Sequence, residues 1–477
     1  MSKPILYLLS ALCSFVVLIA LWCALFVFQL GLPTKHSYWT NALVKGKLLA
    51  AQNVTGEKLV FVAGSSGNFN IDSEEFSKLT NIQSVNLGTH AILPLEYMLD
   101  HTKNVLTPGD TVVLALEYLY FAADDRLSDA YIDYLISRDK KYFNGLPVSE
   151  KINVMTYVSL RRLLTPIKES FFSPEPSYAF NVYSEFFYSP YGDSHANNLI
   201  FLNQQMRDQR SIAPPEFRIL SIKESKNNWL LLKHFSEWCK ERNISLLAVP
   251  PATMKFNIYD QANYRDALEN LNVLYADAGI KFIGDPYQVM YDTNLFFDTN
   301  YHANQLGKAA YTDTLIQWIK PYLHVQHPLK PIVVEETPVD QALRHFNGWM
   351  PISGLRTLEG PYPEHNLPVV AWGAPQTKLQ LEVARSGNAE FKIEFLANLE
   401  HQPVAVLVDD VQIFSKVITK SLNFESVVLS FPLTQGKHVI TINSSDVSSS
   451  DTGISLLYKT IFFTPPDSKA QKTFSSQ

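Results

Sequence analysis

Residues 58–67 read Lys58-Leu-Val-Phe-Val-Ala-Gly-Ser-Ser-Gly67, a short apolar run that ends in a turn of glycine and serine. The run has the length and the β-branched and aromatic content of a buried strand. Two later runs, 84–87 and 111–116, have the same character, and stretches with helical periodicity such as 93–106 lie between them. Strands that alternate with helices predict a parallel sheet covered by helices on both faces.

The same alternation resumes further along the chain. Helical periodicity over 227–241 leads into the apolar run 244–249, and a last helix is predicted over 303–319. The segment between the third and fourth strands, about 122–245, is rich in Tyr and Phe and is much longer than a usual βα connection. It fits either a lid or substrate-facing subdomain, or ordinary helical packing.

Two segments of this α/β pattern hold residue types suited to nucleophilic catalysis. A serine after the first strand of an open parallel sheet lies at the edge where ligands bind, and flanking glycines allow a tight turn with free backbone N–H groups. Before the last helix, Asp298-Thr-Asn-Tyr-His302 places an acid and a histidine in one loop. The histidine could act as the base for a serine nucleophile, and the acid could orient the histidine. The structural alternative is that the polar residues of this loop cap the helix.

Together these segments resemble the SGNH (GDSL-like) hydrolase superfamily over about residues 58–322. Gly64-Ser65-Ser66 is similar to the family's first block, which implies that Ser66 is the nucleophile. Val85-Asn-Leu-Gly88 is similar to the second block, so the backbone N–H groups of Ser66 and Gly88 are the expected oxyanion donors. The loop 298–307 resembles the last block, which implies that His302 is the base and Asp298 the orienting acid.

Two features depart from the family pattern. Many members place the acid two or three residues before the histidine, whereas Asp298 stands four residues before His302. The third block normally supplies an asparagine after the third strand, where this chain has Glu117-Tyr-Leu119. These departures favour the rival class, a non-catalytic glycan-binding or scaffold protein.

The N-terminal region carries an apolar run without charged residues over 5–32. About 28 residues at about 1.5 Å each span about 42 Å, more than the roughly 30 Å of a bilayer's hydrocarbon core. The run exceeds the core of a signal peptide, and no Ala-x-Ala cleavage motif follows. We therefore expect an uncleaved membrane anchor over 1–32 and a stalk over 33–57. Lysines on both sides of the run leave its orientation open by charge.

The pattern changes again after the α/β domain, which is expected over 58–325. Prolines and mixed charge over 326–375 predict a linker. From 376 to 464, short alternating runs separated by turn residues predict a β-sandwich that could bind carbohydrate. A polar tail over 465–477 is expected to lie outside the fold.

Composition excludes several classes of protein. The chain has 40 Lys and Arg against 46 Asp and Glu, a net charge of −6, and this argues against a nucleic-acid partner. Its cysteines are Cys13, Cys23 and Cys239, and the first two lie in the apolar run. The remaining chain therefore cannot form an internal disulfide or a thiolate zinc cage. No metal and no cofactor are expected.

The order of anchor, α/β domain and β-rich module resembles that of membrane-anchored O-acetyltransferases of alginate and related exopolysaccharides. The resemblance implies a single-pass protein of the inner (cytoplasmic) membrane with its large domain in the periplasm. It implies an enzyme that passes an acyl group, expected to be acetyl, from Ser66 to a polysaccharide. A multi-spanning membrane acyl-carrier protein is the partner that such transfer would need. The alternatives are a membrane-anchored carbohydrate esterase and the scaffold protein named above.

Overall fold

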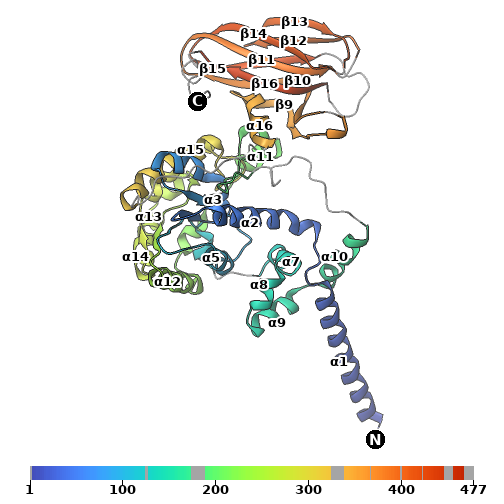
Figure 1. The fold of residues 1–477 in the computed structure, drawn as a ribbon, viewed down its shortest axis with the longest axis vertical. Helices are drawn as coiled ribbons and strands as arrows, with labels where there is room; N and C mark the ends of the chain where they lie inside the picture. Colours follow the sequence, from blue (N-terminus) through green and yellow to red (C-terminus); the bar gives the residue numbers. More distant parts are fainter. Residues whose placement is uncertain are drawn as a thin grey trace.

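The computed structural model describes residues 3–123, 127–172, 188–202, 204–323, 338–365, 367–397, 400–421, 423–444 and 455–466. An apolar N-terminal helix, an α/β domain with a parallel sheet and a mainly antiparallel β-sandwich follow one another along the long axis of the molecule (Figure 1). The three kinds of structure predicted from the sequence are therefore present.

The sheet of the α/β domain has five parallel strands in the order β2-β1-β3-β4-β6. Their bounds are β1 (Leu59–Val62), β2 (Ser84–Asn86), β3 (Thr111–Leu114), β4 (Ser245–Ala248) and β6 (Lys281–Phe282). A separate pair is formed by β5 (Thr253–Met254) and β7 (Met290–Tyr291). The strand order reverses beside β1, because β2 lies on one side of it and β3 on the other. Ligands of open parallel sheets bind beyond the carboxyl ends of the strands at such a point.

Helices cover both faces of this sheet because successive side chains of a strand point to opposite faces. In β1, Leu59 and Phe61 join the apolar cluster under α3, α4 and α15, whereas Val60 and Val62 join the cluster under α2, α5, α12 and α14. The bounds of these helices and of α13 are α2 (Lys35–Asn53), α3 (Ser65–Asn70), α4 (Ser73–Thr80), α5 (Leu95–Lys103), α12 (Lys226–Glu241), α13 (Ala262–Glu269), α14 (Leu271–Asp277) and α15 (Gln305–Ile319).

The segment predicted as a stalk, 33–57, is instead part of the domain. Its helix α2 begins with a capping box between Thr34 and Ser37 and contacts β2 and α7. The residues that it buries recur at helical spacing and are Ser37, Thr40, Leu43, Val44, Lys47, Ala50 and Ala51. The charged Lys47 within this buried face hides the periodicity in the sequence, and for this reason the stalk prediction was wrong.

The long insertion, as far as residues 127–172, 188–202 and 204–245 describe it, is helical. Helices α7 to α10 lie beside α2 and the end of α1 (Lys3–Gln29). By contrast, Asn197 donates to Phe69 O in α3 and Arg210 of α11 donates to Phe296 O, so the part over 188–202 and 204–211 lies against α3 and the loop that precedes α15. The helices associated with the insertion are α6 (Leu119–Ala122), α7 (Asp129–Arg138), α8 (Lys140–Gly145), α9 (Val148–Tyr157), α10 (Leu160–Phe172) and α11 (Gln204–Ser211).

The C-terminal strands pair in the order β13-β12-β15-β10-β16-β11-β14, and β9 pairs with β10. Inward and outward residues alternate along β11 and β12, as the period of the sequence predicted. The strand bounds are β8 (Phe346–Asn347), β9 (Met350–Glu359), β10 (Val370–Val383), β11 (Gly387–Ala397), β12 (Gln402–Val408), β13 (Val411–Ile418), β14 (Glu425–Leu433), β15 (Gly436–Ser444) and β16 (Leu456–Thr464).

The range predicted as a linker, 326–375, holds regular structure from residue 338 onward, so the prediction was wrong for that part. Pro338 is the first residue of α16 (Pro338–His345), a position at which proline is well tolerated. The buried Trp349 donates its indole N–H to Ile461 O at 2.7 Å and ties the segment to the sandwich. Residues 326–337 and 467–477, the latter within the predicted tail, lie outside the described residues.

The β-sandwich is also packed against the α/β domain. One apolar cluster contains sandwich residues such as Leu358 together with Leu199, Phe201 and Phe297 of the α/β domain. The Arg207 guanidinium donates to the backbone oxygen of Ile352 in β9. The sandwich therefore lies next to the loop that precedes α15, close to the candidate site.

Candidate active site

Ser66 lies at the first turn of α3, directly after β1 and Gly64. The side chain is at the reversal point of the sheet, as the sequence predicted for a serine after the first strand. Ser66 is 2% exposed, and its Oγ has no hydrogen-bond partner among the residues that the structure describes. The hydroxyl is thus buried and not paired with a base in this conformation.

His302 and Asp298 form a pair in the loop before α15. His302 Nδ1 lies 2.8 Å from Asp298 Oδ1, in spite of the four-residue spacing. If Nδ1 carries the proton, Nε2 is left as a proton acceptor. The imidazole ring stacks on Phe69 with the ring centroids 4.3 Å apart. Phe69 follows Ser66 by one helical turn, so Ser66 and Phe69 share a face of α3 and His302 lies against that face.

Asn70 holds the histidine loop against α3. Its Nδ2 donates to Tyr301 O at 2.7 Å, and its Oδ1 accepts the N–H of Ala303 at 2.7 Å. Asn197 adds a second tie by donating to Phe69 O and to Ala303 O. These bonds bring residues that are more than 200 positions apart in the sequence to one edge of the sheet.

Glu117 occupies the place where the family resemblance led us to look for an asparagine. Its Oε1 accepts the N–H of Ser66 at 2.7 Å, and its Oε2 accepts the N–H of Gly64 at 2.9 Å. The N–H expected to stabilise an oxyanion is therefore bonded to a carboxyl group within the protein. Burial raises the pKa of Glu117 and outweighs the opposing effect of these donors. The sequence could have pointed to Glu117, because this acid directly follows the third predicted strand, at the same sheet edge as Ser66.

The second expected oxyanion donor is also engaged. The N–H of Gly88 donates to Asn86 Oδ1 at 2.8 Å. Asn86 is held in turn, because its Nδ2 donates to Gly67 O at 2.9 Å and to Asp193 Oδ1 at 3.2 Å. A Cβ on Gly88 would lie 2.4 Å from the backbone nitrogen of Asn68, so only glycine fits against α3. The second block thus packs against the serine turn, with its N–H directed to a neighbouring side chain.

His90 lies near this site and has a defined tautomer. Its Nδ1 accepts the N–H of Ile92 at 3.1 Å, and its ring meets Trp39 edge-on with centroids 4.8 Å apart. Burial lowers the pKa of His90 to about 4, and the nearby charge of His302 adds to the effect. His90 is therefore neutral at neutral pH and carries its proton on Nε2.

A buried charged cluster lies beneath the second block, and it was not predicted from the sequence. Lys47 of α2 donates to Gly192 O at 2.7 Å, and Lys308 of α15 donates to Ser194 O at 2.8 Å. Asp193 accepts the N–H of Glu74 at 2.9 Å. Burial lowers the pKa of Lys47 to about 7, partly opposed by Asp193. The cluster joins α2, α15 and the 189–194 turn behind the candidate site.

In the part of the chain that the structure describes, no group of three or more His, Cys, Asp or Glu side chains could hold a metal ion. The side chains that meet at the sheet edge are suited instead to proton transfer, through the His302 and Asp298 pair, next to a serine hydroxyl.

No family model and no curated protein matches the chain. Some solved structures are similar to part of this chain. One is a family 35 carbohydrate binding module from an environmental isolate, which is 15% identical. The match covers 25% of this chain and 88% of the module, with a TM-score of 0.20. A family 35 module from Clostridium thermocellum has 16% identity over 22% of this chain and 85% of that chain, and a TM-score of 0.17. The GH26-CBM35 β-(1,4)-mannanase of Podospora anserina has 16% identity over 24% of this chain and 25% of that chain, and a TM-score of 0.19. At such TM-scores these similarities carry no argument about the activity of this chain.

Proposed function

We propose that the protein is a membrane-anchored, SGNH-like serine enzyme that transfers an acyl group to an extracytoplasmic polysaccharide or hydrolyses its esters. The supporting observation is the Asp298–His302 pair, which lies against the face of α3 that carries Ser66. The membrane part of the proposal is supported by α1, the one helix among the described residues that is long and apolar enough to cross a bilayer. The inner membrane, the periplasmic orientation and the acetyl group are parts of the proposal.

In the proposed reaction Ser66 Oγ attacks the acyl carbon of the donor while His302 Nε2 takes the hydroxyl proton. Asp298 holds the imidazole ring and stabilises the charge that it gains. The bond from the acyl carbon to the leaving oxygen or sulfur then breaks, and the leaving group takes the proton from His302. A sugar hydroxyl, or water in an esterase, next attacks the Ser66 ester and gives its proton to His302. The bond from the acyl carbon to Ser66 Oγ then breaks, and Oγ takes this proton back from His302.

Transfer of this kind needs an acyl donor on the same side of the membrane as the α/β domain. A multi-spanning membrane acyl-carrier protein is the partner that we propose for it. The polysaccharide acceptor would meet the site beside the β-sandwich, which packs against the His302 loop through Phe297.

The test is ester hydrolysis by the purified full chain on an aryl acetate. We expect Ser66→Ala and His302→Gln each to lower turnover by about 10³- to 10⁶-fold, as in other triads. Ser65→Ala is the matched control, because it removes the neighbouring hydroxyl from the same turn. A mass spectrum of the stalled enzyme should place the acyl group on Ser66. If Ser65→Ala abolishes turnover and Ser66→Ala does not, the nucleophile is Ser65.

The second candidate is a non-catalytic glycan-binding or scaffold protein. One observation favours it: the N–H groups of Ser66 and Gly88, which an oxyanion would need, are bonded to Glu117 and Asn86. This candidate predicts that neither serine affects aryl acetate hydrolysis, while the chain still retains a polysaccharide on a glycan affinity gel. The first candidate predicts the reverse for Ser66→Ala, so the two assays separate them.

A further inference from the structure

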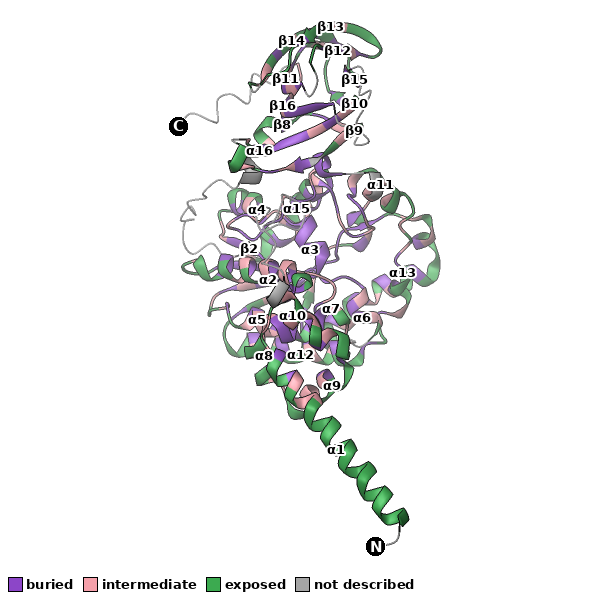
Figure 2. Cartoon of the chain, turned by 90° about the vertical axis from the view of Figure 1, so that its right-hand side faces the viewer, coloured by how far each residue is buried: buried purple, intermediate pink, exposed green. Residues whose placement is uncertain are grey.

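The last turns of α1 are built into the α/β domain. Residues 3–21 of α1 are exposed, whereas Phe26 is 1% exposed and meets the ring of Phe143 at 5.6 Å. The indole N–H of Trp22 donates to Met155 O in α9 at 3.2 Å. Helix α1 is therefore not a free tether, because α8, α9 and α10 each contact its end. Figure 2 shows this end of α1 meeting the domain near α9.

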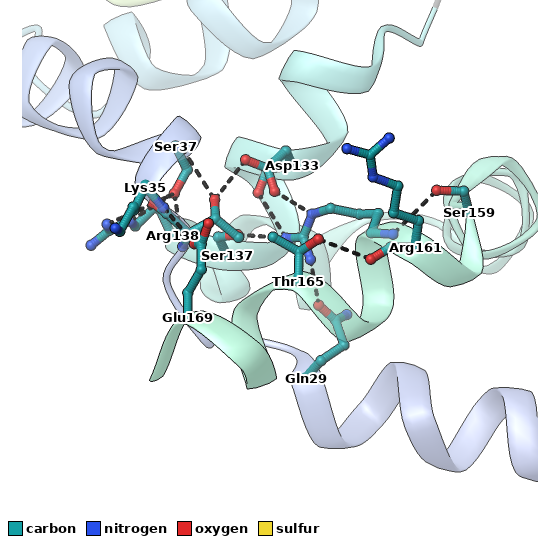
Figure 3. A network of polar contacts seen from close by, with 12 residues as sticks. Gln29, Lys35, Ser37, Asp133, Ser137, Arg138, Ser159, Arg161, Thr165 and Glu169 are labelled. Atoms are coloured by element: carbon teal, nitrogen blue, oxygen red, sulfur yellow. Dashed lines mark hydrogen bonds and ion pairs between the residues drawn. The ribbon is translucent and has the colours of Figure 1, made fainter. Parts of the chain in front are cut away.

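A polar network fixes the direction of α1 relative to these helices (Figure 3). Arg162 of α10 pairs with Asp133 of α7, and its guanidinium also donates to Gln29 Oε1 of α1 at 3.0 Å. Arg138 donates to Ser37 Oγ at 2.9 Å and so ties α7 to α2. Because side chains from four helices meet here, the surface of α9 and α10 is held in one orientation relative to α1.

That surface carries exposed apolar side chains at helical spacing. Val148 and Ile152 share a face of α9, and Leu160 and Leu164 share a face of α10. Together with Tyr157 they form the surface that we call the α9–α10 patch, whose members are 47–72% exposed. On α1, whose end contacts α9 and α10, Val27 and Phe28 are also exposed. Monomeric soluble proteins rarely expose a contiguous apolar surface without a partner.

The length of α1 places the patch at a membrane boundary. The exposed part, about 19 residues over 3–21, spans about 28 Å, close to the roughly 30 Å of a hydrocarbon core. Trp22 is the next residue, and its bond to Met155 puts α9 at the level where that core ends. Trp22 and Tyr157 are residue types enriched at this level. Exposed basic residues that could bind lipid phosphates lie on the helices at this end of the domain, Lys140 and Lys141 on α8 and Arg161 and Lys168 on α10.

From this arrangement we infer that the α9–α10 patch is a membrane-binding surface, seated at the boundary between lipid headgroups and acyl chains beside α1. The occupant is the lipid bilayer, because α9 and α10 contact the end of the proposed anchor and exposed basic side chains lie on α8 and α10. The inference rests on the proposed anchoring by α1. It adds a second contact with the bilayer, the α9–α10 patch, to the one made by α1. The α/β domain therefore lies on the membrane surface.

The test uses the full chain in nanodiscs that hold one copy each. After Cys13→Ala, Cys23→Ala and Cys239→Ala, one environment-sensitive fluorophore is attached through Ile152→Cys. Leu12→Cys reports on α1. Val273→Cys on α14 is the matched control, because Val273 is an exposed apolar residue of similar exposure that lies away from the patch. Lipids with a nitroxide on the acyl chain quench fluorophores that touch the hydrocarbon.

We expect the probe at position 152 to lose at least half of its emission, the probe at 12 to lose more, and the probe at 273 to keep its emission. Quenching at 12 with none at 152 would overturn the inference and leave the anchor intact. No quenching at 12 would overturn the proposed anchoring instead. If position 152 is shielded only in discs that hold two copies or an added membrane partner, the patch binds protein and the inference is wrong. Unfolding midpoints equal to that of the unlabelled chain establish that the variants fold.

Discussion

Gly64→Ala should loosen the serine turn by displacing the Glu117 carboxyl group. A Cβ on Gly64 would lie 2.7 Å from both carboxyl oxygens of Glu117 and 2.8 Å from the hydroxyl of Tyr120. Glu117 is 1% exposed and cannot turn into solvent, so it must release one or both of the N–H groups that it accepts. Each buried N–H left without a partner costs about 1–3 kcal/mol. The backbone φ of −80° at Gly64 lies outside the left-handed region, so the effect comes from the carboxyl group.

Hydrogen exchange of peptides covering residues 59–70 measures this effect locally, which matters because a chain with several domains does not unfold in two states. A loss of about 1–3 kcal/mol corresponds to roughly 5- to 150-fold faster exchange. The matched control is Gly46→Ala in α2, where a Cβ meets nothing within 4 Å. Alanine there should stabilise the helix by about 0.5–1 kcal/mol. Unchanged exchange over 59–70 in Gly64→Ala would refute the assignment of these two amides to Glu117.

Two further predictions concern pH. The pKa of Lys47 is about 7 in the folded chain, against 10.5 for an ordinary lysine. Between about pH 7 and pH 10.5 the unfolded chain therefore binds more protons than the folded chain. The stability of the wild type should rise with pH over this range. Hydrogen exchange of peptides from α2, corrected for the intrinsic pH dependence of exchange, should lack this rise in Lys47→Met, and parallel pH profiles would contradict the shift. In the sandwich, the bond to Asp409 raises the pKa of His438. Burial raises the pKa of Asp409, but the hydrogen bonds from His438 and Val439 and the charge of His438 together lower it by more. The pair therefore stabilises β15 below the raised His438 pKa and above the lowered Asp409 pKa. Asp409→Asn should speed exchange of 436–444 at about pH 6 and change it little at about pH 9, and equal effects at both would contradict the pairing.

The sequence predicted those parts of the fold whose signals are local. The strands of the sheet are short apolar runs that end at turn residues, and the C-terminal strands alternate with a period of two. Helix α2 was missed because its buried face includes Lys47, whose ammonium group reaches a backbone oxygen far away in the sequence. Strand β9 was missed because the prolines around it suggested a linker, although Pro338 begins a helix.

The sequence allowed the residues of the candidate site to be predicted, but not all of the hydrogen bonds between them. Ser66, Asp298 and His302 lie at one sheet edge because the carboxyl ends of parallel strands meet there, which follows from the pattern of elements. The contact between Glu117 and Ser66 depends on β3 lying directly beside β1, with Val62 opposite Leu114. The order of strands in a sheet is not written in any one segment, so this contact could not be predicted from local sequence.

The choice between an enzyme and a binding protein depends on the energy needed to free two N–H groups. A single oxyanion donor contributes about 2.7–4 kcal/mol to a transition state. Releasing the Ser66 N–H from Glu117 leaves a buried carboxyl group without its partner, at a cost of about 1–3 kcal/mol. Releasing the Gly88 N–H requires Asn86 to turn, although its amide nitrogen is held by two acceptors in addition to Asp193. Catalysis through both donors would thus lose much of what they contribute. An active enzyme must therefore move Glu117 when substrate binds, and a scaffold protein has no reason to do so.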